Sequence, residues 1–222
     1  ATSWGISTRL IGAVILAHGD KKGLRLPPNI APVQVVIIPI SRDEKQKKLV
    51  KDYINVMVNE LVDMKVRYIV DWSDASPGYK FNEWEMKGVP VRLEVGPRDI
   101  ANNQAVIARR DTNEKENIDI SKSSNIVSNY LDEIQSNLFK QAKQFMDNNT
   151  FDVSDYIEFK SKLQNGGFLR CGWDGSIETE NKIKEETKAT IRCIPFEQNI
   201  SGMKCIYSGK PAKFEVIFSK AY

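Results

Sequence analysis

The stretch VQVVIIPI, residues 33–40, and the long segment that follows it constrain the fold more than any other feature. A continuous run of β-branched and apolar residues of this length is typical of a buried strand. Ser41-x-x-Glu44 then has the pattern of a capping box, which predicts the start of a helix. Apolar side chains recur at helical spacing through residues 42–64, at Val50, Ile54, Met57, Val58 and Leu61. A strand followed by an amphipathic helix predicts an α/β layered fold.

The chain continues this alternation up to about residue 147. Strands are predicted at 66–72, 91–95, 104–112 and 117–121, a short helix near 80–87, and a long helix over 123–147. These elements predict a mostly parallel or mixed sheet with flanking helices. DNNT, residues 147–150, predicts a break. The remainder is expected to be a small α+β unit, with helices near 154–164 and 179–187 and strands at 189–195, 204–208 and 213–218.

Composition excludes several classes of protein. The 222 residues carry a net charge of only +3, which neither favours nor excludes a polyanionic partner. No apolar run is long enough to span a bilayer, and the N-terminus lacks the features of a signal peptide. Three cysteines cannot form a complete disulfide framework, so a cytoplasmic setting is expected. The chain opens on ATSWGISTRLIGAVIL, which looks like the middle of a domain, so we expect the C-terminal part of a longer protein.

Cysteine and histidine chemistry has few candidates in this sequence. Cys205-Ile-Tyr-Ser208-Gly has the form of a zinc-ribbon turn in which a hydroxyl replaces the second thiol. Structural zinc needs about four nitrogen or sulfur ligands, and the only histidine is His18, in a Gly- and Pro-rich connector. Bound zinc and a catalytic triad are therefore not expected, and no phosphate-binding or dinucleotide motif is present.

Residues 76–99 combine aromatic and charged side chains between glycines and prolines. Phe81 and Trp84 could stack on an unpaired base, while Glu85 accepts hydrogen bonds and Arg92 and Arg98 donate them. A carboxylate with an arginine matches the donors and acceptors of guanine in a single-stranded loop. Equally, aromatics at this spacing can simply pack in a core, with the charges forming a solvated face. The pattern leaves both interpretations open.

Four motifs carry a resemblance to a known family. They are TSWGISTRLIGA at residues 2–13, the connector and strand at 18–40, SPGYKFNEWEMKGVPVRLEVGPRD at 76–99, and ATIRCIPF at 189–196. In this order they resemble prolyl-tRNA synthetases of the archaeal and eukaryotic type, which are class II aminoacyl-tRNA synthetases. The resemblance covers the whole chain and implies three segments, with boundaries at 1–32, 33–146 and 147–222.

Residues 1–32 resemble the end of the class II catalytic domain and its connector. The resemblance places Arg9 at the arginine that stacks on ATP. It places Ser3, Trp4 and Gly5 on the strand at the floor of the proline pocket, with Ser7 beside it. A guanidinium plane suits adenine and triphosphate, and a Trp wall suits the apolar ring of proline.

Residues 33–146 resemble the anticodon-binding domain. Proline anticodons end in two guanines, and the family match implies that these bases are contacted by Phe81, Glu85, Arg92, Arg98 and Asp99. Some relatives have lysine at the position of Arg98, which keeps the charge but changes the hydrogen-bond geometry.

Residues 147–222 resemble the extra C-terminal domain of this subgroup, in which many members bind zinc through four cysteines. This chain keeps Cys171 and Cys205 at ligand positions, has Thr179 (or Ser176) and Ser208 at the other two, and matches a non-ligand cysteine with Cys193. The resemblance therefore implies that the metal is lost. In the family the last residue, here Tyr222, turns back toward the active site.

The resemblance implies a ligase that attaches proline to its tRNA through prolyl-adenylate, using ATP and Mg²⁺. The complete protein is expected to be a cytoplasmic homodimer with no membrane association, and its partners are tRNA(Pro), proline and ATP. This chain would supply anticodon recognition and the last part of the ATP and proline site. The alternative is a stand-alone RNA-binding module without catalytic activity.

Overall fold

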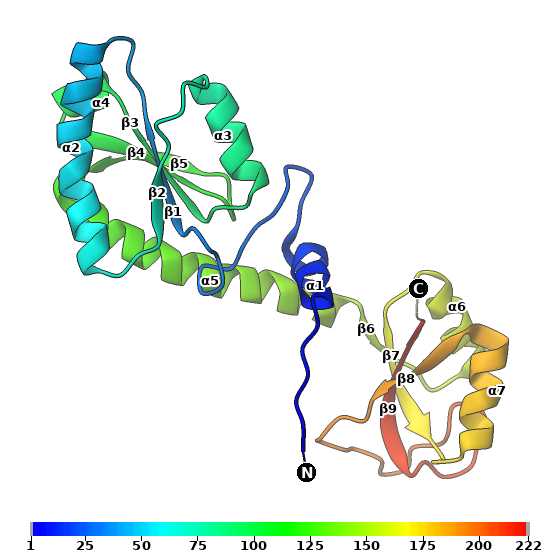
Figure 1. Ribbon diagram of the computed structural model, residues 1–222. Coiled ribbons are helices and arrows are strands. Elements are labelled where there is room, and N and C mark those ends of the chain that lie inside the picture. The colour runs from blue at the N-terminus through cyan, green and yellow to red at the C-terminus, as the bar shows by residue number, and fades with distance from the viewer. Residues whose placement is uncertain (1, 221–222) are drawn as a thin grey trace. The chain divides into compact units, whose positions relative to one another are not determined.

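The computed structural model describes residues 2–220, so the prediction for Tyr222 lies outside the described residues. The chain divides into two compact units, one ending at Ala142 and the other beginning at Lys143. The first unit is a mixed α/β layer structure and the second a smaller α+β unit, as the sequence predicts (Figure 1). No helix in the described part combines the length and apolar character needed to cross a bilayer.

A five-stranded sheet of order β2-β1-β3-β4-β5 forms the first unit. Its strands are β1 (Val35–Pro39), β2 (Tyr68–Val70), β3 (Val91–Val95), β4 (Gln104–Arg109) and β5 (Lys115–Asp119). β1 lies parallel to both β2 and β3, whereas β4 is antiparallel to β3 and β5. The sheet is therefore mixed, with its two central strands, β1 and β3, parallel.

Helices cover both faces of this sheet (Figure 1). They are α2 (Glu44–Asp63), α3 (Pro77–Met86), α4 (Pro97–Ala101) and α5 (Ser123–Asn148). Alternate residues of β1 and β3, such as Ile37 and Leu93, pack with Ile54 of α2 and Ile134 of α5 in the main core. On the other face, Val36 and Ile38 form a smaller cluster with Phe81 and Trp84 of α3. This second face carries the side chains considered below.

The start of α2 differs from the predicted capping box. Asp43, not Ser41, is the N-cap residue, and its side chain accepts a hydrogen bond from the backbone N–H of Gln46 at 2.8 Å. The side chain of Gln46 in turn accepts from the backbone N–H of Arg42 at 3.0 Å. The helix therefore begins at Glu44, two residues later than predicted.

The N-terminal segment is exposed in this chain. Residues 2–7 form no strand, in contrast to the strand that the resemblance implies, and Trp4 is 93 % exposed. The assignment of Ser3, Trp4, Gly5 and Ser7 to a proline pocket stays a prediction. Arg9 is the first residue of α1 (Arg9–His18), a helix without buried residues. The connector after α1 contacts the end of α3 through backbone hydrogen bonds from Leu24 to Met86 and from Leu26 to Gly88.

The second unit packs two helices on a four-stranded sheet of order β6-β7-β9-β8. Its elements are β6 (Thr150–Asp152), α6 (Tyr156–Gln164), β7 (Phe168–Trp173), α7 (Ile177–Thr187), β8 (Ala189–Cys193) and β9 (Phe214–Lys220). Phe159 of α6, Ile183 of α7 and Phe218 of β9 are fully buried in its core.

The strands of this unit differ from the prediction in three places. β6 and β7 were not predicted, although they pair with each other in the sheet. Residues 204–208, predicted as a strand, instead form a turn with isolated bridges at Lys204 and Cys205. The turn passes so close to β7 that a Cβ added to Gly172 would lie 2.4 Å from the carbonyl oxygen of Lys204.

Candidate nucleic-acid interface

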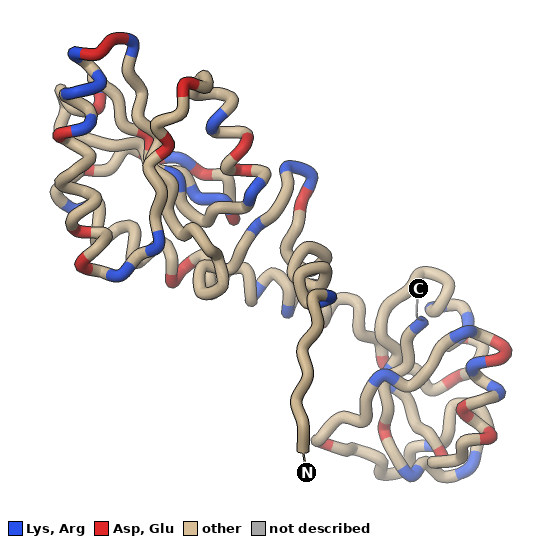
Figure 2. The backbone as a smooth tube through the Cα atoms, in the orientation of Figure 1, with Lys and Arg blue, Asp and Glu red and all other residues tan. Residues whose placement is uncertain are grey.

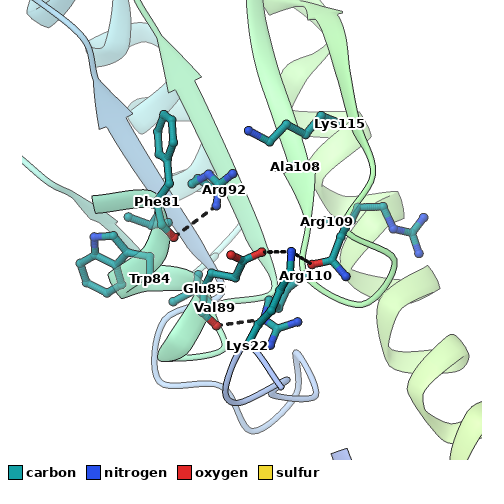
Figure 3. A pocket seen from close by; sticks show the side chains of 12 residues that line it. Lys22, Phe81, Trp84, Glu85, Val89, Arg92, Ala108, Arg109, Arg110 and Lys115 are labelled. Atoms are coloured by element: carbon teal, nitrogen blue, oxygen red, sulfur yellow. Dashed lines mark hydrogen bonds and ion pairs between the residues drawn. The ribbon is translucent and has the colours of Figure 1, made fainter. Parts of the chain in front are cut away.

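A cavity of about 280 Å³ lies between α3, the sheet and the connector. Phe81, Glu85 and Arg92 all line it, so the structure brings together three of the five residues predicted to contact bases (Figure 3). Phe81 and Glu85 lie one turn apart on α3, and Arg92 comes from β3. Arg92 faces this cavity because its neighbours Val91 and Leu93 point into the main core on the other side of the sheet.

Arg92 and Phe81 are held together as a pair. The guanidinium carbon of Arg92 lies 4.6 Å from the centre of the Phe81 ring, a cation–π distance. Its Nε donates to Oε1 of the buried Glu94 at 3.1 Å, and its Nη1 donates to the Phe81 carbonyl at 3.4 Å. Lys115 shares this arrangement, since its Nζ is 3.0 Å from the same Glu94 oxygen and 5.0 Å from the Phe81 ring centre.

Trp84 contributes more to packing than to an open surface. Its Nε1–H donates to Asp71 at 2.7 Å, and its ring packs with Val36 and Ile38 of β1. Burial acts to raise the pKa of Asp71, but hydrogen bonds from Ser73 and Trp84 outweigh it and keep that pKa below its ordinary value. Trp84 and Phe81 are therefore both partly buried against the sheet, and Phe81 also lines the cavity.

Glu85 is the acceptor at the mouth of the cavity. Its Oε1 accepts from Nζ of Lys22 at 3.0 Å, and Lys22 also donates to Oδ1 of Asn113 at 3.1 Å (Figure 3). The side chain of Glu85 is 23 % exposed, so it is accessible to a ligand.

Arg98 and Asp99 line a different cavity, of about 450 Å³, together with residues 40–42 and Gln46. The carboxyl ends of the parallel strands β1 and β3 meet here, whereas Arg92 lies near the start of β3. Asp99 accepts from the backbone N–H of Gly96 at 2.8 Å, which fixes the first turn of α4. The structure therefore does not bring Arg98 and Asp99 together with Glu85.

Sequence reasoning missed five polar or charged residues that line the first cavity, namely Lys22, Arg109, Arg110, Asn113 and Lys115. All lie in the connector or at the β4–β5 hairpin, outside the segment 76–99 that carries the aromatic and charged pattern. The distribution of charge along the chain does not single out these residues, because basic and acidic positions are interspersed along both units (Figure 2). Only the antiparallel pairing of β4 with β3 brings the hairpin beside Arg92.

Thr179 and Ser208, two of the positions at which the resemblance places zinc ligands in other members, belong to a hydrogen-bonded cluster. Oδ2 of Asp174 accepts from the hydroxyls of Thr179 at 3.0 Å and Ser208 at 2.6 Å, and its Oδ1 accepts from the backbone N–H of Ser176 at 3.0 Å. Burial raises the pKa of the Cys171 thiol to about 12.

No group of three His, Cys, Asp or Glu residues within 2–220 could hold a metal ion. Cys171 and Cys205 are buried and Cys193 is exposed. Two thiols, with a carboxylate already hydrogen-bonded to two hydroxyls, do not fit a structural zinc site. That this domain has lost the metal stays a prediction.

Comparison with known proteins agrees with this geometry. Residues 34–130 match the family described as anticodon binding domain, and residues 156–222 match the one described as prolyl-tRNA synthetase, C-terminal. The chain belongs to the prolyl-tRNA synthetase family.

Curated relatives of this family align with the whole chain. The chain is 48 % identical over 227 residues to a proline–tRNA ligase of Bacteroides fragilis, and 46 % identical over 223 residues to one of Amoebophilus asiaticus. The alignments cover 100 % of this chain but 46 % and 45 % of those two relatives. The chain therefore spans about half the length of the curated relatives that it matches.

Proposed function

We propose that the complete protein joins proline to tRNA(Pro) and that this chain recognises the anticodon. The observation that carries the proposal is the cavity in which Glu85 and Arg92 lie beside Phe81, within the part that matches anticodon binding domains. The relatives' name, proline–tRNA ligase, supports the reaction.

The chemistry of guanine supports this assignment. Guanine has the donors N1–H and N2–H on its Watson–Crick edge and the acceptors O6 and N7 on its Hoogsteen edge. Glu85 can accept from the donors, while Arg92, held over the ring of Phe81, can donate to an acceptor. The second cavity offers the same pair of groups in Asp99 and Arg98. Because proline anticodons end in two guanines, we assign one base to each cavity.

The residues before the connector would act only in the complete protein. There Arg9 would stack over the adenine of ATP and offset triphosphate charge, with Ser3, Trp4, Gly5 and Ser7 at the proline pocket. ATP with Mg²⁺ would activate the proline carboxylate as an adenylate. Homodimerisation through the part that this chain does not span, and a cytoplasmic location, belong to the same proposal.

A binding experiment tests the proposal directly. The chain is titrated with a proline anticodon stem-loop and with a variant loop in which both guanines are adenines. We expect Glu85→Ala to lower the discrimination between the loops by about 1–3 kcal/mol, the usual value of one good base contact. Equal loss of affinity for both loops would contradict a role for Glu85 in specificity. Circular dichroism checks that the variant remains folded.

A further inference from the structure

The turn Asp20–Gly23 in the connector forms one wall of the cavity that contains Glu85. The backbones of Asp20 and Gly23 hydrogen-bond to each other, at 3.0 and 3.2 Å. The next residues run along the end of α3, with the N–H of Leu24 donating to the Met86 carbonyl at 2.9 Å. A Cβ added to Gly23 would lie 2.5 Å from that same carbonyl oxygen, so the two backbones are in close contact.

Arg110 joins this turn to α3 through hydrogen bonds to both. Its Nη1 and Nη2 donate to the two oxygens of Asp20 at 2.8 and 2.6 Å. Its Nε donates to the backbone carbonyl of Glu85 at 2.9 Å (Figure 3). The Arg110 side chain is only 4 % exposed, and its hydrogen bonds hold the pKa of Asp20 well below the ordinary value. A bidentate, buried guanidinium fixes geometry as well as charge.

Lys22 belongs to this turn, and its ammonium lies beside the carboxylate of Glu85. Its backbone N–H donates to Asp20 at 2.9 Å, while its ammonium bridges Glu85 and Asn113. Only Oε1 of Glu85 is engaged by Lys22, so Oε2 keeps its lone pairs for another donor. The ammonium also offsets the negative charge that a carboxylate would present to an anionic RNA.

We propose that Lys22 is a specificity-determining residue of the guanine site, acting by holding the carboxylate of Glu85 in the orientation that accepts from guanine. The inference rests on the proposed function of this cavity. An ion pair in which Lys22 is 52 % exposed contributes little to stability, so support of the fold does not account for its position. A glutamate side chain with free rotation would lose rotamer entropy on binding the base, and the ion pair with Lys22 reduces that loss.

The test compares two neighbouring lysines in the whole chain. Lys22→Met removes the ammonium from Glu85, whereas Lys21→Met removes the same charge from the adjacent exposed residue. Each variant is titrated with the proline anticodon stem-loop and with the loop carrying two adenines. We expect Lys22→Met to reduce the affinity ratio of the loops by at least about fivefold, the low end of one good base contact. Lys21→Met should leave the ratio unchanged.

A double variant separates positioning of Glu85 from general attraction of RNA. In a Glu85→Ala background, Lys22→Met should change the ratio no further, because the group that it positions is absent. Lys22→Arg should restore most of the discrimination.

Three outcomes would overturn the inference. If Lys22→Met and Lys21→Met weaken both loops equally, Lys22 acts only as a positive charge. If the unmodified chain discriminates but Lys22→Met keeps the ratio, this inference alone fails. If the unmodified chain does not discriminate, the proposed function fails with it.

Discussion

At the scale of single residues, Asp174 is the centre of a hydrogen-bonded cluster in the second unit. Burial acts to raise its pKa, but hydrogen bonds from Ser208, the backbone of Ser176 and Thr179 outweigh burial and lower it. A carboxyl group whose pKa is depressed by folding stabilises the protein above its unfolded pKa of about 3.9, and that stabilisation is lost as pH falls through the folded value.

We therefore expect Asp174→Asn to destabilise the chain at pH 7 by about 1.5–3 kcal/mol, the range for hydrogen bonds to a charged group. The difference from the unmodified chain should shrink as the pH falls through the folded pKa of Asp174, which lies below 3.8, because only below that value is Asp174 protonated in both states of the unmodified chain. Urea unfolding followed by circular dichroism at a series of pH values measures this. A difference that is independent of pH would show that the charge of Asp174 is not involved.

Sequence predicts which residues carry charge but not which of them meet. Thr179, Ser176 and Ser208 were identified as replacements for thiol ligands, yet Asp174, the group that joins them, was not singled out. The capping error at Ser41 has a similar cause, since Asp43 also has a glutamine three residues later and competes for the same role. A capping pattern in the sequence therefore does not decide which of two nearby oxygen acceptors, Ser41 or Asp43, is the N-cap.

At the scale of elements, α3 ends in a motif that depends on Gly88. The N–H of Gly88 donates to Glu85 at 3.1 Å and the N–H of Val89 donates to Trp84 at 3.2 Å, which is the Schellman pattern. Gly88 has a φ of +74°, and a Cβ there would lie 2.5 Å from Cβ of Leu24 in the connector. This glycine therefore allows both the helix end and the approach of the connector.

Gly88→Ala should destabilise the first unit by about 1–3 kcal/mol, the cost of a strained left-handed residue, with a further cost from the contact with Leu24. Gly78→Ala is the matched control on the same helix, because a Cβ at Gly78 meets nothing within 4 Å. Alanine should stabilise that position by about 0.4–1 kcal/mol. Thermal unfolding of both variants measures the effects, and equal melting temperatures would contradict this account of the helix end.

The sequence predicts most elements of the first unit because their apolar patterns are regular, although α1 and α4 were not predicted. β3 was predicted with its observed bounds, and α2 and α5 within about two residues, since their apolar spacing is regular. β7 was missed because Gly172 carries no side chain and Cys171 was considered as a metal ligand rather than a core residue. Residues 204–208 have the apolar pattern of a strand, but they form a turn in which Cys205 and Ile206 are buried.

At the scale of the whole molecule, sheet topology decides which residues share a site. Phe81 and Lys115 are far apart in sequence, yet both lie at the first cavity because β3 pairs with β4 and β4 with β5. Arg98 follows Arg92 by six positions but lies beyond the other end of β3. The residue types of the site could be predicted from sequence, while its division into two cavities follows from the direction of one strand.

Each unit also has its own buried core, which allows recognition and the stability of the second unit to be separated. Ile54 belongs to the first core and Phe159 to the second, and they are 1 % and 0 % exposed. Ile54→Ala should cost about 2–5 kcal/mol and Phe159→Ala about 3–5 kcal/mol by removing buried contacts.

Because both proposed base-binding cavities are lined only by residues of the first unit, Phe159→Ala should leave discrimination between the two stem-loops intact. Ile54→Ala should reduce binding at temperatures where the first unit begins to unfold. Calorimetry, with stem-loop titration over the same temperature range, measures both effects. Loss of discrimination in Phe159→Ala, at a temperature where the first unit remains folded, would show that the second unit takes part in reading the anticodon.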